Sequence, residues 1–317
     1  MNEESTDKSV SAIEPWFRLL RVPNLLTVPG DPIAGYLLAN LCFGMEFSAG
    51  ALLLAVVAAL CLYCFGLLLN DMVDIQIDQD ERPDRPLPSG QISFNSARGA
   101  AVAFAFTGLN MALFAGLSVL YTAAVLSVLI ILYNAGFKRL PVVGVVTMGL
   151  CRGVSFLLGC FAALAVPSDI LTVSGIPLLL GFSVVTLTFI GVSAVARNEM
   201  DAEKSFGIQR WLPFIALVLT LPGMVLALSA LELFSQQWAL IYIFLTLMTL
   251  MRSWLLGGMM YRAQAVPLTI GAHIRNHLMV QACLCAAAGG WTGLFAAGVL
   301  VVTSQLFAVL SRRFYSS

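Results

Sequence analysis

Residues 70–90, NDMVDIQIDQDERPDRPLPSG, follow an apolar run over 51–69 that contains no charged residue. A helix that continues through the start of this stretch would place Asp71, Asp74 and Asp78 on one face, because they are spaced at i, i+3 and i+7. Three neighbouring carboxylates repel one another, and a hard cation such as Mg²⁺ relieves that repulsion while sharing its ligand shell with substrate phosphates. The pattern therefore predicts a magnesium site at the end of a membrane-length helix.

The composition of the whole chain is that of a membrane protein. Of its 317 residues, 59% are hydrophobic and 11% are charged, against about 25% charged residues in an average soluble domain. The formal net charge is zero, which argues against nucleic acid as a partner because no basic surface is expected. The seven cysteines lie within or beside apolar runs, where thiols pack as small hydrophobic groups and not as a disulfide framework.

Ten apolar segments are long enough to cross a bilayer. Their approximate ranges are 22–43, 51–75, 94–118, 119–136, 143–165, 172–197, 211–231, 238–260, 268–288 and 291–312. Only two glycines separate the last pair, so nine spans remain the alternative. We predict an all-α, polytopic membrane helical bundle of nine to ten helices, formed by a single domain over residues 1–317.

The distribution of positive charge predicts the orientation of this bundle. The outer loops near 44–50, 166–171, 232–237 and 289–290 contain no Lys or Arg, whereas the basic residues gather in the inner loops and at their helix ends. This pattern places the polar tail over 1–17 and the acidic stretch on the cytoplasmic side. The bacterial inner membrane is the expected location, and the sequence assigns no oligomeric state.

The acidic stretch also resembles a known family signature. The pattern NDxxDxxxD followed by RPxRPLPSG resembles the first motif of the UbiA superfamily of intramembrane prenyltransferases. A second acidic cluster, Glu199, Asp201 and Glu203, stands where UbiA-like proteins carry a second aspartate-rich motif, although glutamates replace aspartates in it. Lys138 and Arg139 resemble the basic element that the family places near the diphosphate.

This resemblance implies a UbiA-like bundle around a central cavity, inside which a prenyl group moves from a prenyl diphosphate to an aromatic or other small lipophilic acceptor. It implies Mg²⁺ as the cofactor. The implied metal and diphosphate ligands are Asn70, Asp71, Asp74 and Asp78 in the first motif, Glu199, Asp201 and Glu203 in the second, and the basic residues Arg82, Lys138 and Arg139. Membrane lipid is the implied surrounding partner.

Four further polar residues lie inside apolar segments. Arg152 needs a partner or a polar cavity at membrane depth, and we predict that it lines the substrate cavity, with snorkelling to the inner interface as the alternative. Asp31 stands between two prolines that break its helix; it is either a locally satisfied carboxylate at a kink or a substrate contact. His273 and His277, spaced i and i+4, are interpreted as interface histidines because no third zinc ligand is evident.

A finer resemblance leaves the function open between two classes. The segments ERPDRPLPSG, CRGVSFLLG and SAVARNEM resemble the EboC branch of UbiA-like proteins, which is associated with a cluster for metabolite processing and export. In addition, Val192 and Val195 replace the acidic and tyrosine positions usual upstream of the second motif. The alternative to catalysis is therefore a non-catalytic protein that binds or transports a prenylated or lipid-like metabolite.

Overall fold

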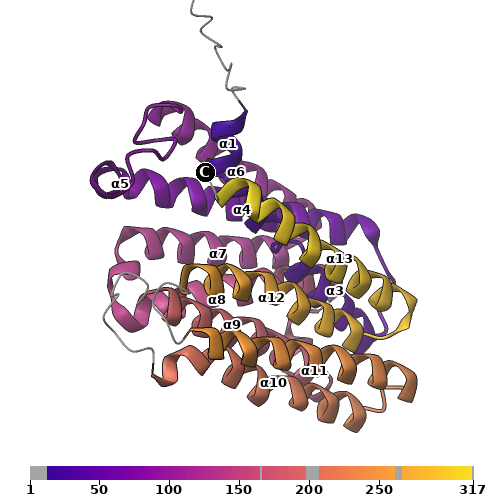
Figure 1. The fold of residues 1–317 in the computed structure, drawn as a ribbon. Coiled ribbons are helices and arrows are strands. Elements are labelled where there is room, and N and C mark those ends of the chain that lie inside the picture. Colours follow the sequence, from indigo (N-terminus) through magenta and orange to yellow (C-terminus); the bar gives the residue numbers. More distant parts are fainter. Residues whose placement is uncertain (1–12, 165, 198–206, 261–265, 316–317) are drawn as a thin grey trace, which may run out of the picture.

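A computed structural model describes residues 13–164, 166–197, 207–260 and 266–315, which form helices and no strand. In chain order the α-helices are α1 (Glu14–Leu19), α2 (Val22–Leu25), α3 (Gly30–Phe43), α4 (Ala49–Val73), α5 (Ile75–Glu81), α6 (Phe94–Ala115), α7 (Leu117–Ala135), α8 (Pro141–Ala163), α9 (Ile176–Ala196), α10 (Leu212–Ala230), α11 (Gln236–Met259), α12 (Val266–Ala287) and α13 (Gly290–Tyr315). Short 3₁₀ turns lie at Phe137–Arg139, Pro167–Leu171, Val173–Gly175 and Ile208–Trp211. The long helices lie side by side, and α5 is at the same end of the bundle as the turn between α7 and α8 (Figure 1).

Each of the ten predicted apolar segments overlaps one of the helices α3, α4 and α6 to α13. Eight of the described helices are long and apolar enough to cross a membrane, namely α4, α6, α7, α8, α9, α10, α11 and α13. Helix α3 has 14 residues, about 21 Å at 1.5 Å per residue, which is shorter than the roughly 30 Å of a bilayer core. Helix α12 is long but carries several buried polar side chains, among them His273, His277 and Gln281. The protein is a multi-pass membrane protein.

The boundary between the adjoining segments 94–118 and 119–136 falls at a glycine. Gly116 separates α6 from α7 and has φ of 139°, a conformation that a residue with a Cβ adopts only under strain. The chain therefore reverses there without a long loop, as the two predicted ranges require.

Helices α3 and α8 pack at very short range because glycines face the partner backbone. A Cβ added at Gly159 would collide with the carbonyl oxygen of Pro32, and one added at Gly35 would collide with that of Phe156. Small residues allow membrane helices to approach closely in this way. This contact brings the start of α3, where Asp31 lies, against the part of α8 that carries Arg152.

The acidic stretch forms the end of α4 and the short helix α5. Asp74 separates the two helices, yet its N–H donates to the carbonyl oxygen of Asn70 and its own carbonyl accepts from the N–H of Asp78. The helical register therefore persists through the break, as the spacing of the aspartates predicts. Helix α5 ends at Glu81, two residues before Pro83, because proline lacks the N–H that a further turn requires.

Candidate active site

The first acidic motif meets the turn between α7 and α8 through Asp74. The Lys138 ammonium lies 2.6 Å from Asp74 Oδ1 and 3.1 Å from Asn70 Oδ1, donating a hydrogen bond to each. Lys138 is held in this position because Gly136 and the 3₁₀ turn Phe137–Arg139 reverse the chain after α7. Two oxygens of the first motif thus converge on one positive charge.

The other two aspartates of the motif have basic partners of their own. Arg21 Nη2 lies 2.9 Å from Asp71 Oδ1, and Arg85 Nη1 lies 2.6 Å from Asp78 Oδ2. Both carboxylates are buried. A buried carboxylate without a positively charged partner would lower the stability of the fold. Arg21, which precedes α2, supplies that partner for Asp71, and Arg85, which follows α5, supplies it for Asp78.

The backbone of Arg21 adopts an uncommon conformation at this site. Arg21 lies between α1 and α2 with φ of 47°, in the left-handed region, where a side chain with a Cβ is disfavoured by about 1–2 kcal/mol. Such strain is retained where surrounding contacts enforce it. Here the ion pair with Asp71 supplies that contact, and it orients the guanidinium toward the cavity.

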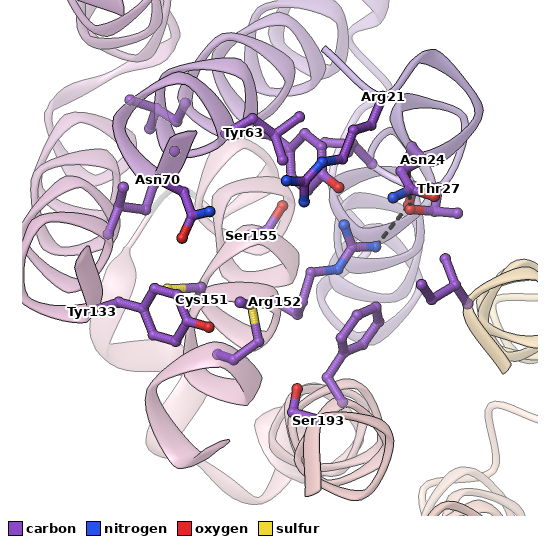
Figure 2. Close-up of a pocket in the computed structure, with 18 of the residues that line it drawn as sticks. Arg21, Asn24, Thr27, Tyr63, Asn70, Tyr133, Cys151, Arg152, Ser155 and Ser193 are labelled. Carbon is purple, nitrogen blue, oxygen red and sulfur yellow. Dashed lines mark hydrogen bonds between the residues drawn. The ribbon is translucent and has the colours of Figure 1, made fainter. Parts of the chain in front are cut away.

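A cavity of about 380 Å³ opens beside this cluster. Its walls come mainly from α4, α7, α8, α9 and α12, and most of its lining is apolar, including Leu62, Leu126 and Ile130. Figure 2 shows Arg21 and Arg152 pointing into the cavity from one side, with Asn70 and Tyr133 on the other. An apolar chamber with a charged rim suits an amphiphilic ligand whose head stays at the rim while its tail lies within.

Arg152 lines this cavity, as the sequence predicts. Its guanidinium donates to the carbonyl oxygen of Thr27 at 2.8 Å and forms an ion pair with Asp31 Oδ2 at 2.8 Å. It also lies 4.7 Å from the centre of the Phe189 ring, within range of a cation–π interaction. Snorkelling to the interface is therefore wrong for Arg152, whose side chain is only 6% exposed.

The partners of Asp31 come from the other end of the chain. His277 Nε2 and Gln281 Nε2 lie 2.8 and 2.7 Å from Asp31 Oδ1 and donate to it. The interpretation of His273 and His277 as interface histidines is wrong, because both are at least 97% buried within the bundle. Helix α12 approaches α3 closely enough to place His277 and Gln281 beside Asp31, and pairing between distant segments of this kind carries no signal in local spacing.

Two of the predicted basic residues lie outside this network. Arg82 is exposed, and its backbone N–H donates to the carbonyl oxygen of Asp78; the neighbouring Arg85 contacts the carboxylate instead. Arg139 is exposed too, and its carbonyl oxygen accepts a hydrogen bond from Arg197 Nη2 at 3.1 Å. The end of α9 therefore lies beside the turn that carries Lys138.

The second acidic cluster, Glu199, Asp201 and Glu203, lies outside the described residues. Arg197 is the last described residue before it. Because Arg197 contacts Arg139, the last turn of α9 lies at the same end of the bundle as Asp74.

The residues at the cavity rim suit a hard divalent cation by their chemistry. Asn70 and Asp74 offer amide and carboxylate oxygens that already converge on a cation, the Lys138 ammonium, and Mg²⁺ prefers such ligands. Among the described residues, no group of three or more His, Cys, Asp or Glu side chains gathers around a single point. A complete metal shell would therefore draw on a phosphate or on the second cluster in addition to these residues.

Comparison with protein families decides the identity of this fold. The model of the UbiA prenyltransferase family matches residues 33–265. The chain belongs to the UbiA prenyltransferase family. Within that range fall the first acidic motif, the Lys138 turn and Arg152. Outside it lie Arg21, Asp31, His277 and Gln281.

Curated relatives of this UbiA family member include archaeal enzymes. A digeranylgeranylglyceryl phosphate synthase of Methanoculleus marisnigri is 34% identical over 148 residues, which cover 47% of this chain and 51% of that protein. The synthase of the same name from Methanopyrus kandleri is 38% identical over 125 residues, which cover 39% of this chain and 46% of that protein. The chain thus spans about half the length of the curated relatives it matches.

Solved structures of UbiA proteins share the fold along nearly their full length. A structure of digeranylgeranylglyceryl phosphate synthase matches with a TM-score of 0.62 at 23% identity, over 87% of this chain and 99% of that one. A UbiA homolog from Aeropyrum pernix K1 matches with a TM-score of 0.63 at 17% identity, over 88% and 98% of the two chains. A UbiA homolog from Archaeoglobus fulgidus bound to GPP and Mg²⁺ matches with a TM-score of 0.50 at 19% identity, over 96% and 100%.

Sequence reasoning on this UbiA protein missed Arg21, Arg85, His277 and Gln281 as members of the polar network. One signal was available for Asp31 and Arg152. The two residues carry opposite charges inside separate apolar segments, and two such charges at membrane depth commonly pair with each other.

Proposed function

We propose that this protein transfers a prenyl group from a prenyl diphosphate to a lipophilic acceptor within the membrane, with Mg²⁺ as cofactor. The observation that carries the proposal is the apolar cavity lined at one side by Asn70. The side chain of Asn70 shares the Lys138 ammonium with Asp74. Membership of the UbiA prenyltransferase family supports it, as does the fold shared with a homolog bound to GPP and Mg²⁺.

In this proposal the acidic residues hold the metal, and the polar and basic residues near the first motif hold the diphosphate. The metal ligands are Asp71, Asp74, Asp78, Glu199, Asp201 and Glu203. The diphosphate contacts are Asn70, Arg82, Lys138 and Arg139, and Arg152 is a substrate contact at the cavity wall. Lys138 has two roles in this proposal. Its ammonium pairs with Asp74, and it would become available to a phosphate oxygen when another cation balances the charge of Asp74. A bound Mg²⁺ would supply electrostatic stabilisation of the leaving diphosphate.

The reaction breaks the allylic C–O bond, and the electron pair leaves with the diphosphate. A nucleophilic carbon or oxygen of the acceptor forms the new bond to the allylic carbon, and the acceptor then loses a proton. Basic side chains at the rim stabilise the charge that develops on the leaving group. The apolar walls exclude water, which would otherwise capture the allylic cation, and the rings of Tyr63, Tyr133 and Phe189 in the lining can stabilise a cation.

The proposal also concerns the chemical class of the acceptor. The curated relatives are named digeranylgeranylglyceryl phosphate synthases, a name that describes a product with a glyceryl phosphate head. A cavity with apolar walls and two guanidinium groups accommodates a lipophilic acceptor with a polar head. Both glycerophosphate lipids and aromatic acceptors with a polar substituent meet this description, so both belong in the assay panel.

Metal removal tests the proposed function directly. We expect protein reconstituted in liposomes to release pyrophosphate from a radiolabelled prenyl diphosphate in the presence of an acceptor and Mg²⁺. Chelation with EDTA should lower the rate to background because the leaving group then lacks its cation, and added Mg²⁺ should restore it. The measurement is radiolabelled product on thin-layer plates. Equal product formation with EDTA and with Mg²⁺ would refute the metal-dependent mechanism.

Non-catalytic binding or transport is the second candidate, and one observation favours it. Each aspartate of the first motif already has a basic partner, so the rim is close to electrically neutral without a metal. A carrier would bind the radiolabelled prenyl diphosphate at equilibrium without releasing pyrophosphate in the presence of any acceptor in the panel. That outcome would replace the catalytic proposal.

We further propose that the acidic rim faces the cytoplasm, across a bacterial inner membrane. The concentration of Lys and Arg in the same loops supports this orientation. The exposed α5 residue Asp80 provides a labelling site. A cysteine introduced as Asp80→Cys should react with a membrane-impermeant maleimide in inverted vesicles and remain unlabelled in intact cells, with the unsubstituted protein as the control. Labelling in intact cells would reverse the orientation.

A further inference from the structure

Asp31 is the centre of a polar cluster that connects three helices, α3, α8 and α12, beside the cavity. It is fully buried, with 0% exposure. Arg152 from α8 and His277 and Gln281 from α12 all place a nitrogen within 2.8 Å of its carboxylate. Gln281 Nε2 also donates to the carbonyl oxygen of Thr27 at 2.7 Å, the same oxygen that Arg152 contacts. Both the Asp31 carboxylate and the Thr27 carbonyl oxygen thus hold the guanidinium of Arg152 in place.

Stability alone is a weak reason for this cluster. A buried ion pair gains little over well-packed apolar residues of similar volume, and polar groups are costly at membrane depth. The close packing of α3 on α8 already relies on Gly35 and Gly159. What the ion pair adds is a fixed position for the guanidinium of Arg152 at the cavity wall.

Two polar atoms at that wall have hydrogen-bonding capacity to spare. Arg152 Nε and Ser155 Oγ are buried and have no hydrogen-bond partner within the part of the chain that the structure describes. Both residues line the cavity and both are at least 94% buried. They are three residues apart on α8, so they lie on one face of the helix. Unsatisfied buried donors are rare in native proteins, and together these two indicate a ligand oxygen.

Phe189 fixes the remaining side of the guanidinium. Its ring packs under Arg152 at 4.7 Å, and the ring of His277 meets it edge-on with centroids 4.6 Å apart. Arg152 can therefore move only if Asp31 or Phe189 moves with it. A preorganised donor of this kind binds its ligand without the cost of ordering a flexible side chain.

We propose that Arg152 Nε and Ser155 Oγ bind an oxygen of the acceptor's polar group, and that Asp31, His277 and Gln281 are positioning residues that hold Arg152 for this contact. The inference rests on the proposed function and adds to it the part of the acceptor that the protein recognises. The ligand chemistry is a hydrogen-bond-accepting oxygen, as in a phosphate, a carboxylate or a carbonyl group. Because Asp31 balances the charge of Arg152, a neutral carbonyl and an anionic oxygen both fit.

An NMR experiment tests the inference without relying on turnover. In protein labelled with ¹⁵N-arginine, the Nε–H signal of Arg152 is assigned by its loss in Arg152→Lys. Phenyl phosphate and benzamide, one anionic and one neutral oxygen probe, should each shift this signal, whereas toluene, which has the same ring and no oxygen, should not. A response to one oxygen probe alone identifies the preferred head group. No response to either probe overturns the assignment of the subsite.

The same signal tests the positioning role. Asp31→Asn keeps the side-chain shape and removes the charge, and we expect it to broaden or displace the Arg152 signal and to weaken the response to the probes. Gln281→Leu provides a second variant in case Asp31→Asn folds poorly, as judged by size-exclusion chromatography. Thr220→Val, which replaces a buried hydroxyl on α10 that donates within its own helix, is the matched control. An unchanged signal in both test variants refutes the positioning role.

Kinetics distinguish this role from a merely structural one. With an acceptor that the wild-type protein turns over, Asp31→Asn should raise KM for the acceptor about tenfold, the loss expected for a displaced charged hydrogen bond, and leave KM for the prenyl diphosphate unchanged. Asp31→Glu should recover part of the loss. Equal changes in both KM values would indicate a general structural defect and refute the inference. Absence of wild-type turnover would count against the proposed function alone, because the NMR response decides the subsite.

Discussion

Asp74→Ala is expected to lower the rate of prenyl product formation by about 10³-fold or more. Asp74 lies at the junction of α4 and α5 and contributes an oxygen to the point where Asn70 and Lys138 meet. Loss of one metal ligand there removes several kcal/mol of charge stabilisation from the leaving diphosphate, and each 1.36 kcal/mol corresponds to about tenfold in rate. The measurement is the single-turnover rate with radiolabelled prenyl diphosphate at saturating acceptor.

Asp80→Ala is the matched control for this variant. Asp80 belongs to the same acidic stretch but is exposed on α5, so its removal should leave the rate within about twofold, as for most surface substitutions. Glu199→Ala extends the test to the second acidic cluster and should also abolish the reaction. If Asp74→Ala and Glu199→Ala both retain wild-type product formation, the catalytic assignment is wrong.

Lys138→Ala is expected to lower the single-turnover rate by about 10²-fold. Removal of one preorganised donor to a developing negative charge typically has an effect of this size. The structure adds a second reason: Lys138 is the residue through which the turn after α7 contacts the first motif. Lys138→Arg should recover part of the activity, because it restores the charge but with a planar group in place of a compact ammonium.

Two other basic residues provide comparison variants for Lys138→Ala. Arg139→Ala should lower the rate less than Lys138→Ala does, because Arg139 is exposed and its described hydrogen bonds involve its backbone atoms. Arg98→Ala, an exposed basic residue near the start of α6, is the control for loss of positive charge as such. An Arg98→Ala variant that is as slow as Lys138→Ala would show that overall charge, and not the contact with Asp74, determines the rate.

The fold class and most of the helix boundaries could be predicted from the sequence because they depend on local properties. Apolar length predicts a span, and Pro83, which lacks an N–H, predicts the end of the acidic helix. The boundary between the segments 94–118 and 119–136 was predicted two residues after Gly116, where the structure places it. The prediction of nine to ten spans agrees approximately with the structure. Eight of the described helices are long and apolar enough to cross a membrane, whereas α3 is short and α12 carries buried polar residues. Helix α12 can carry polar residues because those such as His277 are buried against other helices and do not face lipid.

The candidate site could be predicted in part. Asn70, Asp74 and Lys138 were predicted as site residues by motif, and the structure places them in contact. Arg82 was predicted as a substrate contact of the first motif. In the structure Arg85, and not Arg82, forms the ion pair with Asp78, because the turn after α5 directs Arg85 toward that carboxylate. Both arginines stand in the same Arg-Pro repeat, so no local pattern could have chosen between them.

Local chemistry along the chain determined that this protein is a helical membrane bundle with an acidic motif at one end of a spanning helix. Tertiary structure alone decided which polar side chains pair. Arg21 pairs with Asp71, and Arg152, His277 and Gln281 pair with Asp31, the last two across about 250 positions of sequence. The physical reason is that a span forms from the hydrophobicity of its own residues, whereas a buried charge finds its partner only where packing brings distant helices together.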